Sequence, residues 1–174
     1  YTSIQDAVDA SSEGDEIIIF PGEYEEAVDL KNKFLYVHGY DPYNTIIFNT
    51  LGDYDHCPLW VGPQTVENLT LYAKKDPNED YSGLRPPYAV HLDQRWGSTK
   101  TAIFRHCRFF NDFGGEIGTG VIDGVHIIVD DCYAEDNIVN ANAMQVHGDT
   151  TGTGVATIDI INSTLKVVKD SGNG

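Results

Sequence analysis

The sequence predicts an all-β solenoid that begins with a short capping α-helix. Three observations predict it: an amphipathic opening segment, short apolar runs that end in turn residues, and four self-similar segments further along the chain. Self-similarity of this kind is typical of solenoids, in which each repeat packs on its neighbours. We expect one domain over residues 1–174, part of a longer chain, with the capping helix in 1–12, the coils in 15–168 and a tail in 169–174.

The first elements follow from apolar spacing. Ile4, Ala7 and Val8 recur at helical intervals and share one face of the opening segment. Residues 17–20 then form an unbroken apolar run that stops at a Pro-Gly pair, which is typical of a strand buried on both faces. Residues 34–39 and 45–50 repeat this pattern, so a helix followed by successive short strands is expected.

Four later segments align with one another, over residues 66–71, 104–109, 129–134 and 160–165. Their third positions carry residues that tolerate left-handed backbone and bond locally to it, namely Asn68, His106, Asp131 and Asn162. This pattern predicts a bend between two strands of each coil, with the flanking side chains stacked inward. The uneven spacing of the segments requires loops, and we expect the polar, Pro-rich stretch 74–87 to project from the solenoid.

The charge balance limits the classes of partner. The chain has 11 Lys and Arg against 27 Asp and Glu, a formal net charge of −16. A nucleic-acid backbone requires a basic surface, so we expect no nucleic acid, and anionic membranes are disfavoured for the same reason. No apolar stretch approaches the ~20 residues of a membrane span. Neutral glycans, cations or simple solubility remain compatible with this composition.

Three cysteines are too few for a disulfide framework and lack the paired spacing of a zinc site. Cys107 and Cys132 occupy equivalent places in two of the aligned segments. We expect them to be stacked, buried small side chains, with a disulfide between neighbouring coils as the alternative.

The opening Ile4-Gln-Asp-Ala-Val-Asp-Ala10 and the turn Pro21-Gly-Glu-Tyr-Glu-Glu26 resemble the N-terminal cap and first coils of pectin methylesterase-like proteins. The resemblance implies a single-stranded right-handed parallel β-helix. It also implies catalytic counterparts at Asp112 and Asp136, within 110–113 and 136–141. The family's glutamine and arginine motifs have no match here, so an esterase or a depolymerase with paired aspartates is the alternative function.

Residues 88–165 resemble β-helix domains of phage and prophage tail proteins, through short motifs in 88–93, 107–109, 117–120 and 161–164. This resemblance implies a polysaccharide-recognising module of a tail fibre, a receptor-binding appendage or a secreted surface protein, located outside the cell or on a virion. Its expected partner is a polysaccharide or cell-surface glycan, and a homotrimer or other chains of a tail assembly are the implied protein partners. A structural spacer is the third hypothesis.

A contact patch is predicted around the segment 88–96. Strand alternation places Tyr88, Val90 and Leu92 on one face and exposes His91 and Asp93 on the other. Aromatic rings offer flat faces to sugars, while Asp, Arg and Gln bind hydroxyl groups. The predicted substrate-binding residues are Tyr88, His91, Asp93, Gln94, Arg95, Trp96, Gln145 and His147. A buried His91–Asp93 pair and an acid/base pair are the alternatives.

No cofactor is predicted, and calcium is the alternative. Asp76, Asn78 and Asp80 have the alternating oxygen spacing of a calcium loop, but the glycine and glutamate of an EF-hand are missing. An ordinary solvated loop is therefore expected in this stretch.

Overall fold

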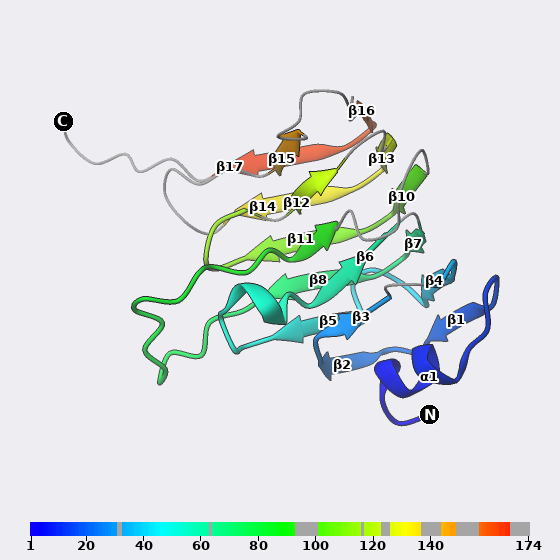
Figure 1. The fold of residues 1–174 in the computed structure, drawn as a ribbon, viewed down its shortest axis with the longest axis horizontal. Helices are drawn as coiled ribbons and strands as arrows, with labels where there is room; N and C mark the ends of the chain where they lie inside the picture. The colour runs from blue at the N-terminus through cyan, green and yellow to red at the C-terminus, as the bar shows by residue number, and fades with distance from the viewer. Residues whose placement is uncertain are drawn as a thin grey trace.

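The computed structural model describes residues 1–30, 33–62, 64–92, 101–115, 117–122, 126–136, 144–148 and 157–167. Its strands form three parallel sheets that wind into a β-solenoid, with one short helix at the N-terminal end (Figure 1). The predicted fold class is confirmed. Every pairing joins a strand to the equivalent strand of the next coil, which is the arrangement that stacked repeats impose.

The strands are assigned to sheets A, B and C in the order in which each coil meets them. Sheet A contains β1 (Glu16–Ile19), β4 (Tyr36–Gly39), β7 (Thr65–Glu67), β10 (Thr101–Arg105), β13 (His126–Asp130) and β16 (Thr157–Ile161). Sheet B contains β2 (Gly22–Glu25), β5 (Thr45–Asn49), β8 (Thr70–Ala73), β11 (Arg108–Asn111), β14 (Tyr133–Asp136) and β17 (Thr164–Val167). Sheet C contains β3 (Val28–Asp29), β6 (Leu59–Val61), β9 (Val90–Leu92), β12 (Ile117–Ile122) and β15 (Met144–Gly148). The helices are α1 (Ile4–Ala10) and the 3₁₀ turn η1 (Tyr54–His56).

The core is a set of apolar columns that run along the solenoid axis. In sheet A, the register places Ile17, Val37, Val66, Phe104 and Val129 directly above one another, and all five are buried. Side chains alternate across each strand, so the residues between them face outward. A one-residue slip would turn this whole column to solvent, which is why the register is strongly specified.

The corner between sheets A and B has the predicted left-handed backbone. Asn68, His106, Asp131 and Asn162 have φ values of 57°, 50°, 50° and 49°. The residues that follow three of them, Leu69, Cys107 and Cys132, are buried, and all three cysteines of the chain are free thiols. The expected bends are confirmed, and so is the inward stacking of the residues that follow them, including the two cysteines. The residues that precede the bends were also expected to point inward, and this is wrong, because Glu67, Arg105 and Asp130 are partly exposed and lie in outward positions of their strands.

A pair of substitutions at His106 tests this corner. We expect His106→Val to be about 1–2 kcal/mol less stable than His106→Gly, because a β-branched residue is strained at positive φ while glycine is not. Both variants lose the exposed contact between His106 Nε2 and Asp131 Oδ2 at 3.1 Å, so its loss cancels in the comparison. Urea unfolding measures the difference, and equal midpoints with equal slopes would contradict a left-handed requirement at this position.

The capping helix is fastened at both ends by the first coil. Ser3 caps its N-terminus, and the Glu26 carboxylate accepts hydrogen bonds from the backbone N–H groups of Ile4 and Gln5 at 3.0 Å. The Lys33 ammonium donates to the carbonyl oxygens of Val8 and Asp9 at the other end, where the helix dipole favours a cation. Ile4 and Val8 are buried against the core, as their spacing predicted.

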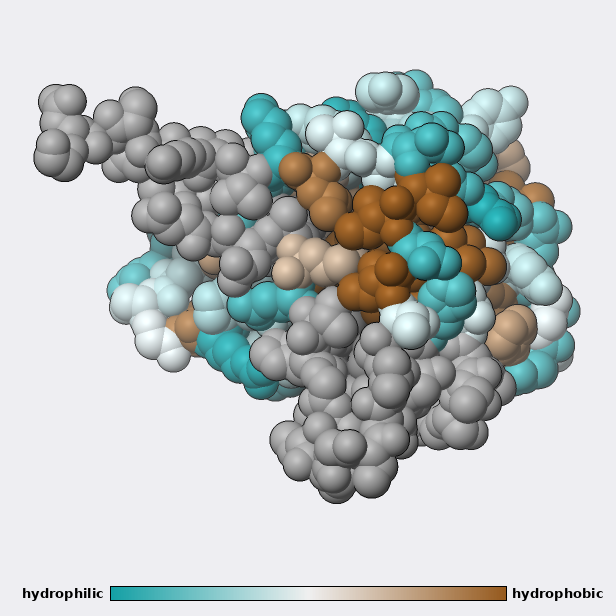
Figure 2. All heavy atoms as spheres, turned by 90° about the horizontal axis from the view of Figure 1, so that it is seen from above, coloured by the Kyte–Doolittle hydropathy of each residue, from teal (hydrophilic) through white to brown (hydrophobic). Residues whose placement is uncertain are grey.

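The last described coil carries apolar side chains at the surface. Seen from above, the end of the solenoid shows an apolar area (Figure 2). Ile160 and Ile161 in β16 are 48% and 43% exposed, although Ile160 continues the core column of sheet A.

In the part of the chain that the structure describes, no helix is long and apolar enough to span a membrane.

Candidate functional site

Three of the predicted binding residues meet on the outer face of sheet C. The register places His91 of β9 opposite Gly118, and Gly118 opposite Gln145 of β15. The Tyr88 hydroxyl donates to Gln145 Oε1 at 2.5 Å. Gly118 is required for this contact, because a Cβ at that position would lie 2.4 Å from the Tyr88 ring. The structure thus joins side chains that are far apart in the sequence.

The exposure expected of His91 is wrong, because its side chain is only 1% exposed. The Tyr54 hydroxyl lies 2.6 Å from His91 Nε2, and the rings of Trp60 and Tyr88 pack on the imidazole at centroid distances of 4.4 and 5.5 Å. His91 is buried because η1 places Tyr54 over this part of sheet C. Tyr88 also departs from the expected alternation, since β9 begins at Val90 and Tyr88 packs with His91 rather than with Val90 and Leu92.

This aromatic cluster fastens two loops to the sheet. The guanidinium of Arg85, from the loop 74–87, lies 3.5 Å from the centroid of the Tyr54 ring. Cys57 Sγ accepts a hydrogen bond from the Tyr88 backbone N–H at 3.3 Å, and burial raises the pKa of this thiol to about 12. The described part of the cluster is therefore a packed support, in which Trp60 and Tyr88 are each 9% exposed.

Five of the predicted contact residues fall, wholly or in their side chains, outside the described part of the chain. Asp93, Gln94, Arg95 and Trp96 lie outside the described residues, and so does the side chain of His147 in β15.

Asp136 belongs to a buried polar ladder at the end of sheet B. The register aligns Asn49, Ala73, Asn111 and Asp136 in successive strands, and the three polar members are almost fully buried. Asp136 Oδ2 accepts a hydrogen bond from the Gly115 backbone N–H at 3.2 Å. Through this bond, the ladder supports the turn after β11, where the coil leaves sheet B.

Within that ladder, Asn111 makes four hydrogen bonds. Its amide Nδ2 donates to the carbonyl oxygens of Pro87 and Gly115 at 3.0 and 2.6 Å. Its Oδ1 accepts from the backbone N–H groups of Phe113 and Gly114 at 2.7 and 3.2 Å. One side chain therefore fixes the turn after β11 and the return of the loop 74–87 to sheet C.

Asp112, the other predicted catalytic aspartate, lies in a different environment. Its carboxylate accepts hydrogen bonds from the Tyr72 hydroxyl at 2.9 Å and the Lys75 backbone N–H at 3.0 Å. Burial and this hydrogen bond to the carboxylate raise the pKa of Tyr72 to about 12. Asp112 is half-buried at the surface of sheet B, whereas Asp136 is fully buried. A nucleophile and a general acid that act together must both face one substrate. Asp112 and Asp136 differ in this respect, because only Asp112 reaches the surface.

The calcium candidates are bonded within their own loop. Asp76 Oδ1 accepts from both nitrogens of Asn78 at 2.9 Å, and Asp80 accepts from the backbone and hydroxyl of Ser82. The Ser82 hydrogen bonds lower the pKa of Asp80. In the described ranges, no group of three or more His, Cys, Asp and Glu residues could hold a metal ion. The oxygens of Asp76 and Asp80 thus shape turns in a surface loop.

The sequence reasoning missed an aromatic column on the outer face of sheet B. Phe48, Tyr72 and Phe110 stand in register in β5, β8 and β11, and all three are half-buried. The Tyr72 and Phe110 rings are 5.8 Å apart, and Tyr133 of β14 continues the contact at 6.0 Å from Phe110. Extending the aligned segments by one residue would have found it, because Tyr72 and Phe110 follow directly after the aligned stretches.

Cations cover part of this column. The Arg108 guanidinium lies 4.8 Å from the ring centroids of both Phe110 and Tyr43, and Lys74 Nζ lies 5.1 Å from that of Phe48. Among the residues that the structure describes, Arg108 forms no ion pair. Sheet B therefore presents aromatic faces and donor groups together, next to the Asp112 carboxylate.

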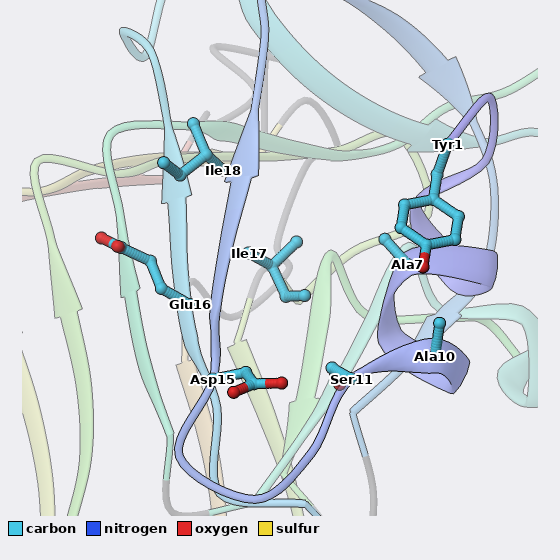
Figure 3. Close-up of a pocket in the computed structure, with 8 residues that line it drawn as sticks. All are labelled: Tyr1, Ala7, Ala10, Ser11, Asp15, Glu16, Ile17 and Ile18. Atoms are coloured by element: carbon cyan, nitrogen blue, oxygen red, sulfur yellow. The ribbon is translucent and has the colours of Figure 1, made fainter.

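A separate cavity of about 350 Å³ lies between α1 and β1. Figure 3 shows its lining, in which Ile17 points toward the helix while Asp15 and Ser11 lie at one end. No predicted site residue contributes to it, so it stands apart from both sheet faces described above.

The comparisons with known proteins support the fold. No family model and no curated protein matches the sequence. Among solved structures, a pectin methylesterase from Yersinia enterocolitica superposes with a TM-score of 0.70 at 16% identity, over 99% of this chain and 57% of that one. Pectin methylesterases from Erwinia chrysanthemi and carrot give TM-scores of 0.58 and 0.57 at 16% and 17% identity, over 98% and 94% of this chain and 63% and 60% of theirs. The chain spans roughly three fifths of these structures and shares their parallel β-helix fold.

Proposed function

We propose that this chain is a polysaccharide-recognising β-helix module that binds glycan on the outer face of sheet B. The observation that carries the proposal is the aromatic column, in which Phe48, Tyr72 and Phe110 present half-buried rings in successive coils. Aromatic faces bind the apolar faces of sugar rings, and charged or amide groups beside them bind hydroxyls. Neighbouring strands are about 4.8 Å apart, so the column offers a regularly spaced row of rings.

The groups around the column fit a neutral glycan. Asp112 lies beside Tyr72, Glu25 pairs with Phe48 in register, and Arg108 and Lys74 supply donors. Both signs of charge are present, while the chain as a whole carries −16 and repels polyanions. Lys74 is exposed on a flexible side chain, so its ammonium can leave the Phe48 ring and donate to a sugar hydroxyl.

The proposed setting is a phage tail fibre, a receptor-binding appendage or a secreted surface protein. It is supported by the short motifs of residues 88–164, and a homotrimer or other tail chains would be the protein partners.

A glycan-array screen followed by calorimetry tests the proposal. We expect Phe110→Ala to weaken glycan binding about fivefold, because the lost ring contact is of the order of 1 kcal/mol. The matched control is Tyr36→Ala, which removes a half-exposed aromatic ring from the outer face of sheet A. Equal losses in the two variants, or full affinity in folded Phe110→Ala, would overturn the assignment to sheet B.

A carbohydrate esterase or depolymerase is the second candidate, supported by the fold shared with pectin methylesterases and by Asp112 beside the aromatic column. The same protein is assayed for ester hydrolysis and for release of reducing ends from polysaccharides, next to Asp112→Asn and Asp136→Asn. Turnover that Asp112→Asn abolishes without loss of binding would make this chain an enzyme. Binding without turnover supports the recognition module.

A further inference from the structure

Two cysteines of neighbouring coils are in contact at the corner between sheets A and B. Cys107 and Cys132 each follow a left-handed residue, and the Tyr133 N–H donates to the Cys107 carbonyl at 2.9 Å. The Cys107 backbone N–H donates to Cys132 Sγ at 3.5 Å, while the Cys107 and Cys132 thiols lie 3.3 Å from the carbonyl oxygens of Arg105 and Asp130. Adjacent strands are about 4.8 Å apart, which falls within the ~4.4–6.8 Å between the Cα atoms of disulfide-bonded cysteines.

A surface groove borders this pair of cysteines. Both cysteines line a surface groove of about 550 Å³, to which His106, Arg108 and Asp131 also contribute. Cys132 is 4% exposed and Cys107 is 1% exposed. Both cysteines therefore border the groove, while their side chains are almost completely buried in the core.

The two thiols have different acidities. The hydrogen bond from the Cys107 thiol lowers the pKa of Cys132, while burial raises the pKa of Cys107 well above its usual range. The thiolate, which is the attacking species in disulfide exchange, thus forms first at Cys132. Cys57 provides an internal contrast, because it is fully buried and its pKa is raised to about 12.

We propose that Cys107 and Cys132 are a redox-active dithiol, which a low-molecular-weight disulfide oxidises to a bond between two coils. The Cys132 thiolate attacks one sulfur of the reagent, forms a mixed disulfide and releases the first reduced thiol. Cys107 then loses its proton and attacks Cys132 Sγ, which releases the second reduced thiol. One disulfide is formed in the protein and one is reduced in the reagent, so atoms and electrons balance.

The bond would lock the solenoid at this corner. It would close a loop between residues 107 and 132, and cross-links of this kind restrict the unfolded chain. The oxidised protein is therefore expected to melt several degrees higher than the reduced protein, and dithiothreitol is expected to reverse the shift.

Thiol counting on the folded chain tests the proposal. The protein is incubated with oxidised glutathione, then denatured and titrated for free thiols, and its intact mass is measured. We expect wild type to lose two of its three thiols and two hydrogen atoms, with no glutathione retained. Cys57→Ser should form the same disulfide and retain no free thiol.

Single variants distinguish the two roles. We expect Cys107→Ser to stop at a glutathione adduct on Cys132, because the resolving thiol is gone, and Cys132→Ser to remain largely unreacted. Wild type that keeps all three thiols while circular dichroism shows a folded protein would overturn the proposal. A disulfide that contains Cys57, or one that joins two molecules, would overturn it as well. None of these results depends on glycan binding.

Discussion

Replacing Asn111 by alanine is expected to lower the free energy of unfolding by about 3–5 kcal/mol. The side chain is fully buried, and its removal leaves two carbonyl oxygens and two N–H groups without their hydrogen-bond partner. A buried polar group left unsatisfied costs about 1–3 kcal/mol, and water entering the space would relieve part of the total. Chemical denaturation of wild type and variant measures this loss.

The matched control is Asn49→Ala, in the same ladder two strands earlier. Asn49 is 6% exposed, and its Oδ1 accepts from the Leu51 N–H at 2.8 Å. We expect a loss of about 1 kcal/mol there, since fewer groups depend on it. If both variants lost the same stability, the assignment of Asn111 as the organiser of the corner would fail. Because Asn111 also holds the carbonyl of Pro87, its variant should increase hydrogen exchange in the loop 74–87.

Replacing Gly39 by alanine is expected to destabilise the protein by about 3 kcal/mol or more. A Cβ at this position would lie 2.1 Å from the carbonyl oxygen of Asn68 and 2.8 Å from Cβ of Leu69. That carbonyl belongs to the left-handed corner of the next coil. Two backbone hydrogen bonds hold this corner: the Asn68 N–H donates to the Arg105 carbonyl at 3.1 Å, and the Arg108 N–H donates to the Leu69 carbonyl at 3.0 Å. The backbone cannot move aside without lengthening these bonds, so the added methyl group strains the stack.

Gly14→Ala separates this steric effect from conformational strain. Gly14 has φ of +88°, and nothing lies within 4 Å of the position that a Cβ would take there. We expect a loss of about 1–2 kcal/mol in this variant, which is the cost of a left-handed backbone for alanine. Thermal and urea unfolding of the two variants give the comparison. A Gly39→Ala protein no less stable than Gly14→Ala would show that the neighbouring coil yields easily.

The repeating backbone was predictable because its signals are local. Helical spacing in Ile4, Ala7 and Val8, and short apolar runs closed by turn residues, are fixed by a few neighbours in sequence. The left-handed corner was equally readable, since Asn68, His106, Asp131 and Asn162 are the residue types that tolerate positive φ. Alignment of these positions also placed Cys107 and Cys132 in equivalent buried places of neighbouring coils.

The candidate site was predictable only in part, because it depends on which side chains cover a sheet. His91 was expected at the surface, yet Tyr54 from η1 packs over it from a segment 37 residues earlier. Strand alternation assigns a side chain to a face and says nothing about what a distant loop places on that face. The aromatic column of sheet B was missed for a different reason. Phe48, Tyr72 and Phe110 occupy outward positions, whereas the repeating apolar pattern of these strands is carried by the inward positions.

The sequence by itself determined the solenoid, its capping helix and the corner that repeats along it, because each depends on local spacing and backbone preference. Only the tertiary structure decided that Asp112 lies at the surface of sheet B while Asp136 is buried in a polar ladder, and that Phe48, Tyr72 and Phe110 form one surface. The physical reason is register, since the neighbours of a side chain in a β-solenoid come from the coils above and below, at separations that variable loops set.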